Sequence, residues 1–187
     1  MNRMIHRICL YLLLLAVAGG AGAQNLKWVH IEHLPANTNG KLYFVQFYTS
    51  WCQLCKRMDN ETYGDSVVAR LLSHHFIPVR FNAEGNTSFR WNGVKYSPTP
   101  TMPGVRHSVH MFAKSVLGKQ LGFPAFAIFD ADQKMLTVMA TYKNAHDLTD
   151  ILCYYASGAY KQQPFERYVD GTLKDKRKEV LRSLNAY

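Results

Sequence analysis

The hydrophobic and polar positions along the chain predict strands that alternate with helices. Short apolar runs rich in aromatic and β-branched residues are typical of buried strands, and we expect strands at residues 28–32, 43–48, 76–81, 125–130 and 136–141. Helical periodicity lies between and after them, and predicts helices at residues 52–61, 66–72, 105–117 and 145–155. Only a tight polar turn separates the last two strands, so we expect them to pair antiparallel. The pattern as a whole indicates an α/β fold.

Other segments predict local structure between and after these elements. Asn92-Gly93 between β-forming residues favours a β-hairpin over residues 89–96. Residues 97–104 contain three prolines and are not expected to form regular structure. A last helix is expected to start at residues 164–168. The basic stretch from residue 174 to 182 is interrupted by acids and is typical of the solvated face of a terminal helix.

The first 23 residues have the features of a secretory signal peptide. Arg3 and Arg7 precede an apolar stretch at residues 8–17, and Ala21-Gly22-Ala23 supplies small residues before an expected cleavage after Ala23. The apolar stretch is too short for an ordinary membrane span, although a membrane anchor is the alternative interpretation. We therefore expect a periplasmic or secreted protein without stable membrane insertion. It would comprise one domain at residues 24–173 and a charged helical tail at residues 174–187.

Composition narrows the classes of protein further. Loss of the leader removes two arginines and no acids, so the formal net charge of +9 becomes +7. The basic residues are spread along the chain, which does not indicate a nucleic-acid surface. The mature chain keeps Cys52, Cys55 and Cys153, too few for a disulfide-stapled scaffold. Cys153 points away from the apolar stripe of its helix, so we expect a partly exposed thiol, either inert or available for an intermolecular disulfide.

The candidate chemistry lies in the Cys-x-x-Cys pair that follows the strand at residues 43–48. Cys52 comes directly after Trp51 and opens the next helix, where unpaired N–H groups and the helix dipole favour thiolate over thiol. Lys56 and Arg57 add positive charge nearby. Because the thiolate is the nucleophile in disulfide exchange, and Cys55 lies one helical turn away, the pattern predicts dithiol–disulfide chemistry at Cys52 and Cys55.

These residues in this order resemble the thioredoxin superfamily. The match consists of the strand–Trp51-Cys52-x-x-Cys55-Lys56–helix unit, the run Gly122 to Asp130 with its Phe123-Pro124 pair, and the order of elements. Exported bacterial thioredoxin-like proteins and the C-terminal domain of the transmembrane disulfide reductase are similar. The resemblance implies an α/β thioredoxin-like fold, with a central mixed sheet flanked by helices and an inserted hairpin before the cis-proline segment.

The resemblance also implies roles for individual residues. Pro124 would be a cis-proline lying against the Cys52–Cys55 pair, and the backbone of Phe123 would bind an extended substrate strand and help exclude metal. Trp51 would pack over the site. The redox-active disulfide would serve in place of a cofactor. The expected partners are a disulfide-bearing protein substrate and a second redox protein that resets the dithiol.

Two departures from the family pattern affect the mechanism. Gln46 occupies the position where many thioredoxins have a buried aspartate that accepts the proton of the resolving cysteine, and a neutral amide cannot act as that base. Glu84, another group or water would have to do so. The segment 85–103 also lengthens the minimal fold, and forms either a flap near the active site or a surface hairpin.

Two other functions are compatible with the same residues. A metal-handling protein could bind copper or zinc through Cys52 and Cys55 together with a neighbouring side chain; the candidates are His74, His75, His107, His110 and Met58. His107 and His110 would lie one turn apart on the helix expected at residues 105–117. A non-catalytic docking module would keep the fold without its chemistry, but such a module does not need both cysteines.

Overall fold

The computed structural model describes residues 26–101, 103–104, 106–172 and 174–184, so the expected signal peptide lies outside the described residues. A five-stranded mixed sheet in the order β1-β3-β2-β6-β7 forms the centre of the fold. Its strands are β1 (Val29–His30), β2 (Leu42–Tyr48), β3 (Phe76–Asn82), β6 (Ala125–Phe129) and β7 (Met135–Met139). The first three strands run parallel, whereas β6 and β7 are antiparallel to their neighbours. The expected α/β fold with a mixed central sheet is confirmed.

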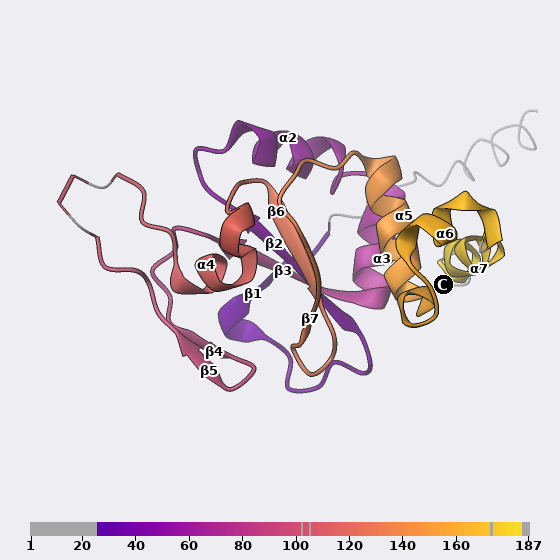
Figure 1. Ribbon diagram of the computed structural model, residues 1–187, viewed down its shortest axis with the longest axis horizontal. Helices are drawn as coiled ribbons and strands as arrows, with labels where there is room; N and C mark the ends of the chain where they lie inside the picture. The colour runs from indigo at the N-terminus through magenta and orange to yellow at the C-terminus, as the bar shows by residue number, and fades with distance from the viewer. Residues whose placement is uncertain (1–25, 102, 105, 173, 185–187) are drawn as a thin grey trace, which may run out of the picture.

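Helices cover both faces of this sheet (Figure 1). The helices and helical turns are η1 (Ile31–His33), α2 (Gln53–Glu61), α3 (Ser66–His75), α4 (Met111–Leu117), η2 (Gly118–Gln120), α5 (Ala145–Ala156), η3 (Ala159–Lys161), α6 (Phe165–Arg167), η4 (Tyr168–Thr172) and α7 (Lys174–Ser183). α2, α3 and α5 contribute to the core on one face, and α4 contributes to the core on the other. Each face of the sheet therefore has its own hydrophobic cluster.

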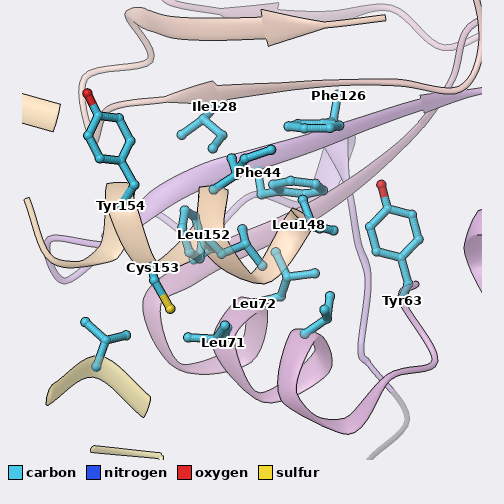
Figure 2. Close-up of a cluster of buried hydrophobic side chains, with 14 of the residues drawn as sticks. Phe44, Tyr63, Leu71, Leu72, Phe126, Ile128, Leu148, Leu152, Cys153 and Tyr154 are labelled. Atoms are coloured by element: carbon cyan, nitrogen blue, oxygen red, sulfur yellow. The ribbon is translucent and has the colours of Figure 1, made fainter. Parts of the chain in front are cut away.

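The cluster on the α3–α5 face is built from side chains of β2, β6 and these two helices. Figure 2 shows Phe44 and Phe126 lying over Leu72 and Leu148, all fully buried. The Phe44 and Phe126 rings stack with their centroids 5.1 Å apart. This cluster supports the face of the sheet on which α2 also packs, through the buried Met58.

The second cluster contains the inserted hairpin, formed by β4 (Phe89–Trp91) and β5 (Val94–Tyr96) as its Asn-Gly turn predicts. Phe89 and Trp91 are buried against Phe112 of α4, with ring centroids 5.2 and 5.4 Å away. The indole N–H of Trp91 also donates to the carbonyl of Gln133 at 3.2 Å. The hairpin is therefore packed onto the body of the domain.

The boundaries predicted for the helix at residues 105–117 and the strand at residues 28–32 were wrong. The helix expected from residue 105 begins at Met111, because His110 is its N-cap and the preceding backbone bonds to other segments. The His110 N–H donates to the Ala83 carbonyl at 2.7 Å, and Thr99 Oγ1 donates to the Val109 carbonyl at 2.6 Å. The strand expected at residues 28–32 ends at His30, since the chain then turns into η1.

The expectation of a partly exposed Cys153 was also wrong, because α7 packs across α5. Val180 and Leu184 are buried in the same cluster as Cys153, and Arg177 forms an ion pair with Asp150 at 2.9 Å. Cys153 has no exposed surface, and this burial raises the pKa of its thiol to about 12. The predicted terminal helix therefore has a buried face as well as a charged one.

Across the described parts of the chain, no helix has both the length and the apolar character needed to cross a membrane.

Candidate active site

Cys52 and Cys55 form a disulfide at the start of α2. The chain leaves β2 at Tyr48, and Cys52 is the N-cap residue of the helix. The Cys55 N–H donates to Cys52 Sγ at 3.1 Å, and the two cysteines are only 5% and 1% exposed. In the reduced protein, the same N–H and the helix dipole favour a Cys52 thiolate.

The two cations after the pair point to solvent. Lys56 and Arg57 are both exposed. The Arg57 side chain donates to Glu61 at 2.8 Å, a bond that raises the pKa of the guanidinium and lowers that of the carboxyl group. Its guanidinium also lies over the Tyr142 ring. Arg57 is therefore engaged away from the disulfide, and the main source of thiolate stabilisation at Cys52 is the helix terminus.

Pro124 lies at the same end of the sheet as the disulfide. The Phe123–Pro124 peptide bond is cis, Pro124 is buried and Phe123 is partly buried. Since Ala125 pairs with Phe47 in antiparallel register, Pro124 lies beside the end of β2, from which the chain continues to Cys52.

Gln46 lies in a partly buried polar network with Asp59 of α2 and Arg80 of β3. Its side chain is fully buried, and its Nε2 donates to Asp59 Oδ1 at 3.0 Å. Asp59 also pairs with Arg80, the residue opposite Gln46 on β3, and Arg80 lies over the Tyr48 ring at 4.5 Å. The side-chain amide oxygen of Gln46, Oε1, is buried without a hydrogen-bond partner.

Sequence reasoning did not single out Asp59, although the spacing of Cys55 and Asp59 contained a signal. Residues four apart on a helix lie on the same face, one turn above each other. Asp59 thus lies on the same face of α2 as Cys55, one turn further along the helix. Its bond to Gln46 joins the Gln46 amide to this part of the helix.

Glu84 lies at the rim of the site, where it contacts Trp51. The Trp51 indole N–H donates to both carboxylate oxygens of Glu84 at 3.1 Å, and His107 Nδ1 lies 2.9 Å from Glu84 Oε1. The Trp51 and His107 rings have centroids 5.0 Å apart. The indole is 50% exposed, so it borders the site and leaves one face open to solvent. The sequence did not predict that His107 belongs to this group.

In the structure the inserted segment continues past residue 103 to the start of α4, and it divides into a packed part and a protruding part. The hairpin at residues 89–96 is held against the core, as expected for a surface hairpin. Figure 1 shows the following loop, between β5 and α4, extending away from the body on the side where α2 begins. This loop carries His107 back to Glu84 and Trp51.

Of the histidines proposed as metal ligands, His107 contacts Glu84 at the rim of the site, and the others lie elsewhere. His110 is buried; its Nδ1 accepts from the Phe112 N–H at 3.1 Å and its Nε2 lies 2.9 Å from the Thr87 carbonyl. His74 and His75 end α3, and Met58 is buried in the core. Within the part of the chain that the structure describes, no group of three or more His, Cys, Asp or Glu side chains is arranged to hold a metal ion.

The fold and the site together define a thioredoxin-type domain with a helix-terminal disulfide. The model of the thioredoxin-like domain family matches residues 35–156, and the chain belongs to this family. A search of curated protein sequences found no match.

The solved structures that are similar to this chain include the following three. A thioredoxin-fold protein from Helicobacter pylori has 14% identity and a TM-score of 0.53, over 89% of this chain and 96% of that chain. The DsbH oxidoreductase has 18% identity and a TM-score of 0.43, over 77% and 90%. A disulphide isomerase from Xylella fastidiosa has 19% identity and a TM-score of 0.37, over 70% and 80%. At 14% identity, the likeness to the Helicobacter pylori protein concerns the fold alone.

A thioredoxin-like domain with a closed Cys-x-x-Cys disulfide has the groups that thiol–disulfide exchange requires. The family and the disulfide support a thiol–disulfide oxidoreductase in general terms.

Proposed function

We propose that the protein is an exported thiol–disulfide oxidoreductase that reduces or exchanges disulfides in partner proteins. The observation that carries this proposal is the Cys52–Cys55 disulfide at the N-terminus of α2, with Cys52 as the capping residue. The signal-peptide pattern in residues 1–23 supports a periplasmic or secreted location.

The reaction begins with attack by the reduced pair. The Cys52 thiolate attacks one sulfur of a partner disulfide, forms a mixed disulfide and releases the other partner sulfur as a thiolate. The Cys55 N–H, which bonds to Cys52 Sγ at 3.1 Å, stabilises the attacking thiolate. Backbone groups of Phe123, before the buried Pro124, would bind the extended chain of the partner.

Resolution returns the pair to its oxidised form. Cys55 loses its proton and attacks Cys52 Sγ, which closes the Cys52–Cys55 disulfide and releases the second partner thiolate. Two electrons have then passed from the dithiol to the partner, and a separate redox protein must return them. Gln46 is a neutral amide and cannot act as the base, so water or another group must accept the Cys55 proton.

The surroundings of Cys52 support the reducing direction. A strongly oxidising pair requires extra stabilisation of its reduced form. The residues between the cysteines, Gln53 and Leu54, are neutral, and Arg57 is engaged with Glu61. Stabilisation of the thiolate therefore rests mainly on the helix terminus, which favours a reductase over a strong oxidant.

Trapping of mixed disulfides tests the function. We expect Cys52→Ala to abolish reduction of a protein disulfide such as that of insulin, and Cys55→Ala to accumulate a mixed disulfide through Cys52, because resolution is lost. Non-reducing electrophoresis and mass spectrometry of the adducts measure both. Cys153→Ala is the matched control and should behave like the parent protein, because Cys153 is buried. Equal trapping by the Cys52 and Cys55 variants would contradict the assignment of Cys52 as the nucleophile.

A further inference from the structure

We propose that Glu84 and His107 are positioning residues for Trp51, and that the inserted segment acts through them on the binding of the polypeptide around a target disulfide. The proposal rests on the proposed oxidoreductase function and adds a specificity element to it. Its three residues come from three separate parts of the chain: the residue before Cys52, the end of β3, and the base of the protruding loop.

The first step of the argument concerns Trp51, an exposed aromatic residue whose side chain is nevertheless held. Its N–H donates to both oxygens of Glu84 at 3.1 Å, and the His107 ring lies against it with centroids 5.0 Å apart. Half of the residue's surface remains open to solvent. The indole is therefore half exposed and held in a defined orientation, and it belongs to the residue directly before Cys52.

Glu84 is itself held in place from the end of β3. Its backbone N–H donates to Asn82 Oδ1 at 3.0 Å, and its side chain is 17% exposed. Its carboxylate bonds to Trp51 on one side and to His107 Nδ1 at 2.9 Å on the other. A carboxylate with partners on both sides leaves the indole little freedom to rotate.

Hydrogen bonds and a ring contact close the base of the loop that carries His107. Three residues further on, the His110 N–H donates to the Ala83 carbonyl at 2.7 Å, and the His110 ring stacks on Phe89 with centroids 5.6 Å apart and an interplanar angle of 13°. Ser108 Oγ donates to the Thr99 carbonyl at 3.1 Å across the loop. The hairpin and the loop base thus place His107 at the rim of the active site.

A polypeptide would use this arrangement more than a small disulfide would. Trp51 and Leu54, 50% and 49% exposed, lie on either side of the buried Cys52 in the sequence and offer apolar surface to the residues that flank a target disulfide. Binding a polypeptide to a mobile indole costs the side-chain entropy of that indole. An indole that is already held in place has lost this entropy before binding. A small disulfide has no flanking residues to contact this surface.

The experiment compares two disulfide probes by stopped-flow with the reduced full-length protein. One probe is a peptide with an internal disulfide and a fluorophore–quencher pair, and the other is bis(2-hydroxyethyl) disulfide. The variants are His107→Ala, which removes both contacts, and His107→Phe, which keeps the ring contact alone. His146→Ala on α5 is the control, because His146 is also an exposed histidine close to carboxylates, at 3.5 and 3.8 Å.

We expect His107→Ala to raise the half-saturating peptide concentration about three- to tenfold, the cost of immobilising one side chain. The limiting rate and the rate with the small disulfide should stay within about twofold of the parent, since the thiolate is stabilised elsewhere. His107→Phe should show an intermediate shift, and His146→Ala none. Trp51 anisotropy, taken as the difference from Trp51→Phe because Trp28 and Trp91 also emit, should fall in His107→Ala.

Two results would overturn the proposal while leaving the proposed function intact. One is an unchanged half-saturating peptide concentration in His107→Ala. The other is an equal loss of rate with both probes, which would indicate an effect on the Cys52 thiolate. If the parent protein reduces neither probe, the proposed function itself fails and this inference fails with it.

Discussion

Position 46 shows how one side chain changes the chemistry available beneath the disulfide. Gln46 is fully buried and its amide bonds to Asp59, whose charge is balanced by Arg80. Burial, and next the Asp59 charge, raise the pKa of Tyr63 well above its usual value, so this phenol stays protonated. The carboxylate bonded to Gln46 is that of Asp59, and the Gln46 amide itself cannot exchange protons near neutral pH.

Gln46→Asp should accelerate the resolving step. Because an aspartate side chain is one methylene shorter than glutamine, the new carboxylate would lie farther from Asp59 than the present amide does, but still near it. Two neighbouring carboxylates cannot both ionise easily, so the pKa of one of them rises toward neutrality. A general base contributes about a hundredfold or more to a proton-transfer step. We expect faster decay of the mixed disulfide by about that factor, measured by rapid quench and alkylation. Stability should fall by roughly 1–3 kcal/mol because a buried hydrogen bond is replaced.

Gln46→Met is the matched control for this prediction. It has a similar size and no base, so decay of the mixed disulfide should not accelerate. An unchanged rate in Gln46→Asp would show that Asp59 or another group already serves as the base.

At the scale of the element, α7 changes the environment of α5. The charged sequence of this helix predicted a solvated surface, but Val180 and Leu184 form a buried stripe that covers the outer side of α5. The ion pair of Arg177 with Asp150 joins the same two helices. As a result Cys153 is enclosed, although its own helix alone would have left it on the outer side.

Cys153 should therefore resist alkylation in the folded protein. In the mature protein, which lacks Cys9, and with Cys52 and Cys55 oxidised, we expect negligible labelling by iodoacetamide at pH 8. The Cys153 thiol has a pKa raised to about 12 by burial and no exposed surface. Val180→Asp places a charge in the stripe, should loosen α7 and should allow labelling, which intact-mass spectrometry measures. Val169→Asp is the control, since Val169 is 46% exposed. Rapid labelling of the parent protein, or equal labelling of both variants, would contradict the packing described for α7.

On the scale of the whole molecule, folding brings the active-site groups together from distant parts of the chain. The parallel pairing of β2 with β3 places Gln46 beside Arg80, and the antiparallel pairing of β2 with β6 places Pro124 near the disulfide. The inserted segment then returns to the end of β3 and adds His107 to the rim. The Cys52–Cys55 disulfide therefore belongs to a site whose residues are held by several strands of the sheet.

The redox state should change the stability of the entire domain. For a reductase we expect a potential near or below about −230 mV, whereas a strong oxidant lies near about −120 mV. Because a low potential means that folding favours the disulfide, the oxidised protein should unfold at a higher temperature than the reduced protein. A difference of several degrees is expected, since about 1 kcal/mol shifts Tm by about 2–4 °C at this chain length.

The two measurements are a glutathione titration with thiol alkylation and calorimetry of both redox states. A higher Tm for the reduced protein, together with a potential nearer −120 mV, would reverse the proposed direction. Absence of any reversible Cys52–Cys55 couple would remove the oxidoreductase function itself.

The sequence alone determined the α/β fold, the strand before the active site, the inserted hairpin and the Cys52–Cys55 pair. These features depend on local patterns: apolar periodicity, the Asn92-Gly93 turn, and a Cys-x-x-Cys pair after a strand. Such patterns act over a few residues, so they can be recognised without knowing what packs against them.

Only the tertiary structure decided the burial of Cys153, the late start of α4, and the two polar groups around Gln46 and Trp51. Each depends on contacts between segments far apart in the chain, such as the Trp51–Glu84–His107 contacts at the rim. A buried amide or an exposed indole carries no sequence signal for its partner, because that partner is set by strand register and by the path of the inserted loop.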